Sequence, residues 1–309
     1  MGLARKLRDR GVLGLNRRNA EYITVLNRRR HYPLVDDKLR TKELAIASGM
    51  AVPELYGVIS TQHETRSLPQ LIGQRDRFVV KPAHGSGGNG ILVITGRHKE
   101  HYRKASGQLV TWNDLSHHVS STISGLYSLG GQRDRAMIEY CVDSHSIFDS
   151  VSFQGVPDIR VIVLLGYPVI AMLRLPTRQS DGKANLHQGA LGVGIDLPTG
   201  TTTTAVQGND PVTEHPDTGQ AIDGLEIPAW HDILELAARS WEITGLGYLG
   251  VDIVIDRNFG PLVLELNARP GLNIQIANQR GLRSPLERVR ELARIDAPLA
   301  DRIDLARKL

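Results

Sequence analysis

The stretch VDIVIDRNFGPLVLELNARPG, residues 251–271, constrains the fold more than any other part of the chain. Residues 251–255 and 261–266 are short runs rich in Val, Ile and Leu, and the turn-forming sequence Arg-Asn-Phe-Gly lies between them. Runs of this kind, bounded by Gly, Pro and Asn, are typical of strands. We therefore expect two antiparallel strands joined by a turn, which is a β-hairpin.

Three polar side chains, those of Asp252, Glu265 and Asn267, interrupt these apolar runs. Side chains alternate between the two faces of a strand, so Glu265 and Asn267 share a face, and an antiparallel partner can bring Asp252 beside them. Carboxylates held together without a counter-charge are costly, so the cluster either faces water or holds a cation. Oxygen ligands that include an amide suit Mg²⁺ bridging substrate phosphates. The hairpin alone leaves both interpretations open.

The composition indicates an ordinary globular protein. With 309 residues, of which 41% are hydrophobic, the chain can form two or three packed units. Its longest uncharged apolar run, residues 161–173, is broken by Gly166-Tyr167-Pro168, whereas a membrane helix needs about 20 residues without such a break. No signal-peptide pattern is present, so we expect a cytoplasmic protein. The single cysteine, Cys141, excludes an internal disulfide and a cysteine-based zinc site.

The positive charge is concentrated at the N-terminal end. Residues 1–31 hold nine Lys and Arg against two acids, while the remainder holds 28 against 31. Basic runs such as Arg28-Arg29-Arg30 can attract nucleic acid, an anionic surface or an acidic substrate, although most charge runs are simply solvated. We expect residues 1–36 to form a basic segment in front of the folded lobes, with an anionic partner or acceptor as its target.

Apolar periodicity and the positions of Gly and Pro predict the other elements. Helices are expected at residues 37–48, 113–126 and 230–244 and after residue 284, and strands at 55–60, 78–81, 91–95, 135–142, 159–165, 169–175 and 189–196.

The segment Gly85-Ser86-Gly87-Gly88-Asn89-Gly90 fits G-x-G-x-x-G, but its context excludes a dinucleotide site. That fingerprint opens a helix, whereas residues 91–95 read as a strand, and no Gly-Lys-Ser/Thr completes a Walker loop. A glycine-rich turn between two strands can instead fold over phosphates as a flap, because no side chains keep its N–H groups away from them. Lys81 precedes this flap, whereas the lysine of protein kinases follows it.

The order of these motifs resembles the ATP-grasp superfamily, and most closely its alpha-L-glutamate ligases. The shared motifs are Asp37-Lys38-Leu39-Arg40, Val80-Lys81, Asn185-Leu186-His187 and Asn267-Ala268-Arg269-Pro270-Gly271, and the resemblance covers about residues 36–271. It implies an α+β fold with two lobes whose antiparallel sheets clasp ATP. The expected N-terminal lobe is residues 37–136 with the flap, and the C-terminal lobe is residues 137–309 with the metal site and the terminal helices.

The resemblance also implies a role for each motif. Lys38 and Lys81 contact the α- and β-phosphates, and the backbone of Glu139, Tyr140 and Cys141 holds adenine. The flap residues Gly85, Ser86, Gly87 and Gly88 cover the phosphates, and Asp158, Lys183 and Asn185 match other nucleotide contacts. Asp252, Glu265 and Asn267 match residues that bind two Mg²⁺ ions in the family, and Mn²⁺ is the alternative metal.

The implied reaction is ATP-dependent formation of an amide or peptide bond. Transfer of the γ-phosphoryl group to a carboxylate gives an acyl phosphate, which an amine attacks with release of phosphate, leaving ADP as the other product. Arg160, Arg174 and Arg269 are the candidates for an arginine that faces the migrating phosphoryl group. The substrates are then a small-molecule or peptide carboxylate and an amine, for which glutamate is a candidate.

Two other classes of function use the same nucleotide-binding residues. A small-molecule kinase of this superfamily phosphorylates a hydroxyl, and a non-catalytic module binds the nucleotide and uses its basic arm for another partner. Typical glutamate ligases carry a full α/β domain before the lysine that corresponds to Lys38, whereas 37 residues precede Lys38 here. A shortened front also resembles ATP-grasp proteins found near sugar-transfer genes.

Overall fold

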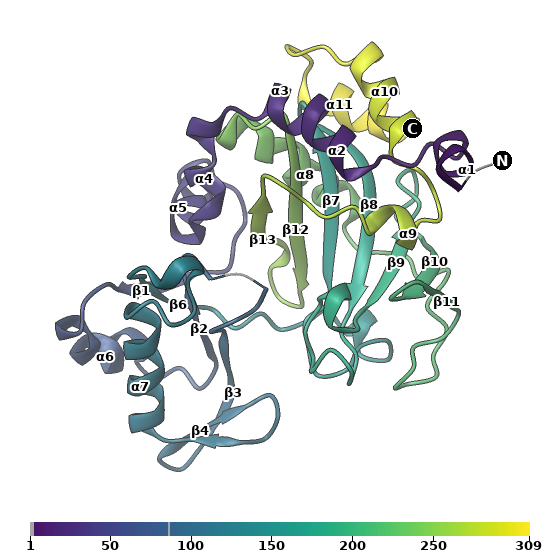
Figure 1. Ribbon diagram of the computed structural model, residues 1–309. Coiled ribbons are helices and arrows are strands. Elements are labelled where there is room, and N and C mark those ends of the chain that lie inside the picture. Colours follow the sequence, from purple (N-terminus) through teal and green to yellow (C-terminus); the bar gives the residue numbers. More distant parts are fainter. Residues whose placement is uncertain (1–2, 86) are drawn as a thin grey trace. The chain divides into compact units, whose positions relative to one another are not determined.

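A computed structural model describes residues 3–85 and 87–309, and the chain forms two compact units of the α+β class (Figure 1). The small unit consists of residues 36–43 and 52–143, and the large unit consists of the chain up to Val35, residues 44–51 and residues 144–309. These limits differ from the lobe boundaries expected from the sequence, because the N-terminal segment belongs to the large unit.

The small unit is built on a six-stranded antiparallel sheet with the order β1-β6-β2-β3-β4-β5. Its apolar core contains Phe78, Ile94 and Leu115, all fully buried. The helix α7 (Trp112–Ile123) begins directly after Thr111 because that side chain forms a reciprocal capping box with Asp114. Its strands and helices are β1 (Leu55–Ile59), α6 (Leu68–Ile72), β2 (Phe78–Pro82), β3 (Leu92–His98), β4 (His101–Lys104), β5 (Leu109–Val110), α7 (Trp112–Ile123) and β6 (Ala136–Glu139).

The large unit is built on a seven-stranded antiparallel sheet with the order β11-β10-β9-β8-β7-β12-β13. Its strands are β7 (Asp158–Leu164), β8 (Tyr167–Leu175), β9 (Leu191–Ile195), β10 (Thr202–Gln207), β11 (Asp210–Val212), β12 (Tyr248–Asp256) and β13 (Gly260–Asn267). The predicted hairpin is confirmed as β12 and β13, and Asp252 pairs with Glu265 across it.

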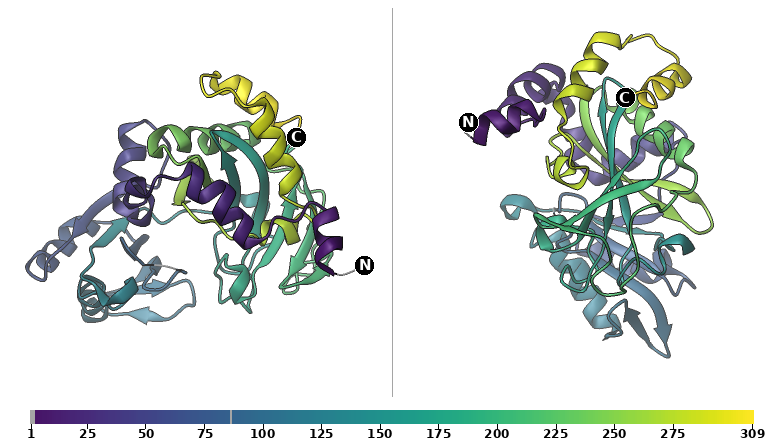
Figure 2. Two further views of the ribbon diagram at one scale, coloured as in Figure 1. Left: turned by 45° about the horizontal axis from the view of Figure 1, so that its top comes forward. Right: turned by 90° about the vertical axis from the view of Figure 1, so that its right-hand side faces the viewer.

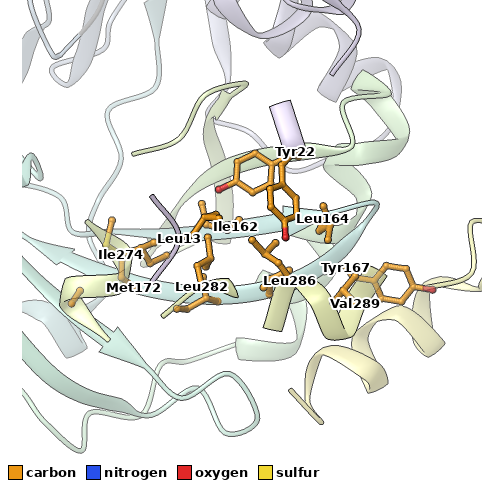
Figure 3. Close-up of a cluster of buried hydrophobic side chains, with 14 of the residues drawn as sticks. Leu13, Tyr22, Ile162, Leu164, Tyr167, Met172, Ile274, Leu282, Leu286 and Val289 are labelled. Atoms are coloured by element: carbon orange, nitrogen blue, oxygen red, sulfur yellow. The ribbon is translucent and has the colours of Figure 1, made fainter. Parts of the chain in front are cut away.

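One face of the large sheet carries a continuous apolar cluster. Ile162 and Leu164 of β7 and Met172 of β8 point to this face, and the C-terminal residues Leu286 and Val289 pack on them (Figure 3). The helix α8 (Trp230–Thr244) contacts β7, β8, β12 and β13. The C-terminal helices are α9 (Ile274–Ala277), α10 (Arg283–Leu292) and α11 (Leu299–Ala306).

The N-terminal segment is part of this core. Leu13 and Tyr22 are each 1% exposed, and they lie among the side chains of β7, β8 and α10 (Figure 3). The segment folds into α1 (Leu3–Asp9), α2 (Leu15–Arg18), a π-helical turn (Asn19–Ile23) and α3 (Thr24–Leu26), and the chain continues through α4 (Pro33–Asp36) and α5 (Lys38–Ala47). Figure 2 shows the purple N-terminal helices beside the yellow C-terminal helices in both views. The expectation of a separate basic arm is therefore wrong, since its apolar residues complete the core of the large unit.

Hydrogen bonds hold the N-terminal segment to distant parts of the same unit. The Leu13 N–H donates to Gln275 Oε1 at 2.8 Å, and Gln275 Nε2 donates back to the Leu13 carbonyl at 3.1 Å. The buried Asn27 amide donates to the carbonyls of Tyr248 at 2.6 Å and Ala268 at 3.0 Å, and it accepts from the Tyr248 N–H at 2.9 Å. These contacts fix the segment against the end of β12 and the loop after β13.

Among residues 3–85 and 87–309, no helix combines the length and the apolar character that crossing a bilayer requires.

Candidate functional site

Strand alternation gathers charged side chains on one face of the large sheet. Asp252 of β12 lies opposite Glu265 on one side and opposite Arg160 of β7 on the other. In the next pair of strands Asp158 lies opposite Arg174 of β8. Neighbours across an antiparallel pair point to the same face, so these charges continue the face that carries Ile162 and Leu164. The sheet thus has an apolar end under the terminal helices and a charged end beyond it.

Two arginines hold Asp252 in the described structure. Arg160 binds it in a bidentate manner, with Nε to Oδ1 at 2.7 Å and Nη2 to Oδ2 at 2.5 Å. Arg174 Nη2 donates to Asp252 Oδ2 at 2.8 Å and to Asp158 Oδ2 at 2.5 Å, and Arg174 Nε also binds Asp158 Oδ1. All four side chains are largely buried, with at most 14% exposed. Arg160 and Arg174, both predicted to face a phosphoryl group, therefore also orient the two acids.

The arginines set the ionisation of the two acids. Burial alone raises the pKa of Asp252, but Arg160 and Arg174 outweigh it and lower that pKa to about 2. Burial raises the pKa of Asp158 to about 6, and the negative charge of Asp252 adds to the effect while Arg174 opposes it. Asp252 is consequently a carboxylate at neutral pH, which is the form that binds a metal ion.

The donor set at this end of the sheet fits a hard cation. Asp252, Glu265 and Asn267 offer two carboxylates and an amide from adjacent strands, as expected from the sequence, and Asn267 Nδ2 lies 3.4 Å from Asp252 Oδ2. Glu265 and Asn267 are half-buried. Among the described residues no group of three His, Cys, Asp or Glu could hold a metal. At this end of the sheet the Asn267 amide oxygen is the third protein oxygen beside the two carboxylates. Oxygen-only ligands of this kind suit Mg²⁺.

The small unit holds a second charged group, formed by two lysines around one glutamate. Lys81 of β2 lies with Nζ 2.5 Å from Glu139 Oε1, and Lys42 of α5 lies with Nζ 2.7 Å from Glu139 Oε2. The three side chains are at most 6% exposed. Two buried cations share one anion, so the group carries one excess positive charge when both lysines are protonated.

Burial lowers the pKa of Lys42 to about 8, although Glu139 opposes this effect. Burial also acts to raise the pKa of Glu139, but Lys81 and Lys42 outweigh it and hold that pKa below its ordinary value. The sequence interpretation missed Lys42. Its signal was the spacing to Lys38, because residues four apart lie on the same side of a helix.

The glycine flap is anchored at its base. The Lys38 ammonium donates to the Gly85 carbonyl, and His84 bonds the buried Asp134 through both its backbone N–H and its ring. Gly87 has a φ of 63°, a backbone conformation that favours glycine. Gly88, also predicted in the flap, has a φ of 80°, while Ser86 lies outside the described residues.

The other predicted nucleotide residues lie in both units. The Tyr140 N–H, predicted to meet adenine, donates to the Glu54 carbonyl at 2.8 Å, and Cys141 is 5% exposed. In the large unit Lys183 is exposed, and Asn185 caps a short 3-10 helix by accepting from the His187 N–H at 3.1 Å.

Arg269, the third predicted catalytic arginine, follows the metal motif. Its side chain is exposed, and its guanidinium carbon lies 4.9 Å from the ring centroid of Tyr32, a cation–π contact with the N-terminal segment.

Comparison with known proteins shows the family of the chain. Residues 17–291 match the family model for sugar-transfer associated ATP-grasp proteins. A "Probable alpha-L-glutamate ligase" of Maridesulfovibrio salexigens is 25% identical over 236 residues, and one of Xylella fastidiosa is 26% identical over 237 residues. Each alignment covers 76% of this chain and 56% of the relative, so the chain spans about half the length of these proteins.

Among solved structures, the D-alanine–D-alanine ligase of Coxiella burnetii is similar, with a TM-score of 0.48 and 16% identity over 90% of this chain and 62% of that one. The family match covers most of the chain and includes both charged groups, the glycine flap and the metal motif. The protein resembles glutamate ligases, has the ATP-grasp fold, and belongs to the sugar-transfer associated ATP-grasp family.

Proposed function

We propose that the protein is an ATP-dependent carboxylate–amine ligase. The observation that carries this proposal is the charged end of the large sheet, where Asp252, Glu265 and Asn267 offer metal ligands beside two buried guanidinium groups. A protein that only stores or senses a nucleotide has no use for such a set, because phosphoryl transfer is what cations at this position accelerate.

The small unit supplies the groups suited to the nucleotide phosphates. Lys42 and Lys81 share Glu139 and leave one excess positive charge, which a phosphate oxygen can neutralise. Lys38 fixes the base of the flap through the Gly85 carbonyl, and we propose that N–H groups of the flap bind phosphate oxygens. We assign adenine to the backbone of residues 139–141, as the family resemblance suggests.

The large unit supplies the groups suited to the transferred phosphoryl. Asp252, Glu265 and Asn267 would hold two Mg²⁺ ions, or alternatively Mn²⁺. By the family resemblance, Asp158, Lys183 and Asn185 would contact the nucleotide. A bound Mg²⁺ supplies neutralisation of charge on the β- and γ-phosphates. Arg160 and Arg174 keep Asp252 ionised and fixed in place, and Arg269 is the arginine best placed to meet an incoming oxyanion, because it is exposed.

The proposed reaction proceeds through an acyl phosphate. A carboxylate is a poor electrophile, and an acyl phosphate formed on the acceptor gives the amine a good leaving group to displace. The phosphoryl group leaves ATP for the carboxylate oxygen, the amine nitrogen bonds the acyl carbon, and phosphate departs with loss of a proton from nitrogen. Two relatives named as probable alpha-L-glutamate ligases support glutamate as a candidate amine or acid.

Hydroxylamine trapping tests this reaction. The protein, ATP, Mg²⁺ and hydroxylamine are incubated with a panel of carboxylates that includes glutamate and glutamate-ended peptides, and ADP and hydroxamate are measured. We expect a hydroxamate with at least one acid, and we expect Glu265→Gln to abolish it while circular dichroism shows the fold intact. A phosphorylated hydroxyl product without any hydroxamate would make the protein a kinase, and metal-dependent nucleotide binding without turnover would make it a binding module.

A further inference from the structure

The N-terminal segment and the loop after β13 enclose a pocket of about 520 Å³ in the large unit. Three of the eight residues that line it are arginines, and none of the eight is acidic. Besides Asn27, the polar residues that line the pocket are Arg18, Asn19, Thr24, Arg29, Tyr32 and Arg269.

Arg18 is the unusual member of this lining. It is 7% exposed, and its guanidinium donates to the Pro270 carbonyl at 2.6 Å and to Asn19 Oδ1 at 2.8 Å. It forms no ion pair with a carboxylate in the described part of the chain. Burial lowers the pKa of Arg18; Tyr248 opposes this effect, and the positive charge of Arg269 adds to it. A buried cation that lacks a counter-ion is costly, and an anion entering the pocket would remove that cost.

The walls of the pocket are held in place. The Asn27 side chain donates to the carbonyls of Tyr248 and Ala268. The Arg18 guanidinium donates to the Pro270 carbonyl, two residues after Ala268. Arg269, in the same loop, stacks on Tyr32 of the N-terminal segment. Arg18 and Arg29 of the N-terminal segment and Arg269 of the loop therefore line one space, and Arg269 lies two residues after Asn267. Two residues of chain span at most about 7 Å, so the pocket adjoins the proposed metal ligands.

We infer that this pocket binds a second anionic group of the acceptor, a carboxylate or a phosphate, so that the acceptor carries at least one negative charge besides its reacting carboxyl. This inference rests on the proposed ligase function, because it names the class of substrate for that site. The guanidinium fork matches both oxyanions with two parallel hydrogen bonds. The charged tail occupies the pocket, and the reacting carboxyl extends toward Glu265 and Asn267.

Matched acceptors separate the two sources of charge. Glutarate is compared with glutaramate, and 6-phosphogluconate with gluconate, since each pair keeps one carboxyl and differs in the tail; inorganic phosphate serves as a further probe. Binding is measured by calorimetry without nucleotide at fixed ionic strength, and KM and kcat are measured by hydroxamate formation. Arg29→Gln is the main variant, because Arg29 is exposed and its loss should spare the fold. Arg18→Lys keeps the charge but loses the fork, and Arg288→Gln, on the exposed face of α10, is the control.

The charged-tail acceptor of one pair should bind more tightly than its neutral match. Arg29→Gln should raise its Kd and KM about tenfold, as expected for a lost charge-assisted contact, with kcat and the neutral match unchanged. Arg288→Gln should change neither. The inference is overturned if no probe binds in an arginine-dependent way, or if the preference survives in both pocket variants. Hydroxamate formed without a charge preference rejects only the pocket, whereas arginine-dependent binding without hydroxamate rejects only the reaction class.

Discussion

Asp252 is both buried and ionised because of the side chains around it. It is buried at 4% exposed, yet it stays ionised because Arg160 and Arg174 surround it. The same two cations that make the carboxylate available as a metal ligand also depend on it as their counter-ion. Removing the acid therefore affects stability as well as metal binding, and the two effects can be measured separately.

Asp252→Asn should destabilise the protein by about 3 kcal/mol, because it leaves two buried guanidinium groups without their shared anion. The measurement is the free energy of unfolding in urea. Asp149→Asn is the matched control, since Asp149 pairs with Arg257 at 3.2 Å but its side chain is 60% exposed. That variant should cost less than about 1 kcal/mol. An equal loss of unfolding free energy in the two variants would show that the buried ion pairs stabilise the protein no more than an exposed ion pair does.

Lys42 predicts a dependence of stability on pH. Its pKa is about 8 in the folded protein against 10.5 in the unfolded chain, so between these values the unfolded chain binds more protons. Stability should accordingly rise as pH increases through this range. Relative to Lys42→Met, the wild type should gain about 2 kcal/mol between about pH 8 and about pH 9.5. Parallel stability curves of the two proteins over this range would contradict the assignment.

The hairpin and most strands could be predicted because their signals are local. The predicted runs 251–255 and 261–266 lie inside β12 (Tyr248–Asp256) and β13 (Gly260–Asn267), and predicted helix 230–244 matches α8. Alternation along the strands also predicted that Asp252, Glu265 and Asn267 would converge. Local apolar pattern and turn chemistry were sufficient for these elements.

The N-terminal helices could not be predicted in the same way. Their basic residues dominate the composition, while the few apolar ones, such as Leu13 and Tyr22, acquire partners only from β7, β8 and α10 far along the chain. The ion pairs of Arg174 with both acids depend on the order of β8, β7 and β12 in the sheet, which no short sequence window contains. Lys42 was overlooked because its partner Glu139 is likewise distant in sequence.

Two leucines of the N-terminal segment provide a direct test of its packing. Leu13 is 1% exposed and Leu15 is 58% exposed, although they lie two residues apart. Leu13→Ala should destabilise the protein by about 3 kcal/mol, because it opens a cavity in the core of the large unit. Leu15→Ala should change the free energy of unfolding by no more than about 0.5 kcal/mol. If both variants unfold at the wild-type urea concentration, the segment does not pack as described.

Binding of MgATP, as proposed, should stabilise the folded protein. At a MgATP concentration of about 100 times its Kd, the free energy of unfolding should rise by about 2.7 kcal/mol. Differential scanning fluorimetry with ATP and EDTA, in place of ATP and Mg²⁺, should show a smaller shift in Tm. The same comparison in Glu265→Gln should show no effect of the metal. A full shift with EDTA present would remove Mg²⁺ from the proposal.

The long sequence separation within the large unit has a consequence during synthesis on the ribosome. Leu13 and its partner Gln275 are 262 residues apart, so at 5–20 residues per second the N-terminal segment emerges roughly 13–52 s before its partner. All residues of the small unit, 36–43 and 52–143, emerge within this interval. Until β7, β8 and α10 have been synthesised, Leu13 and Tyr22 lack the partners that bury them. The nascent chain thus offers an apolar and basic segment of the kind that a chaperone would shield until the residues around Gln275 have emerged.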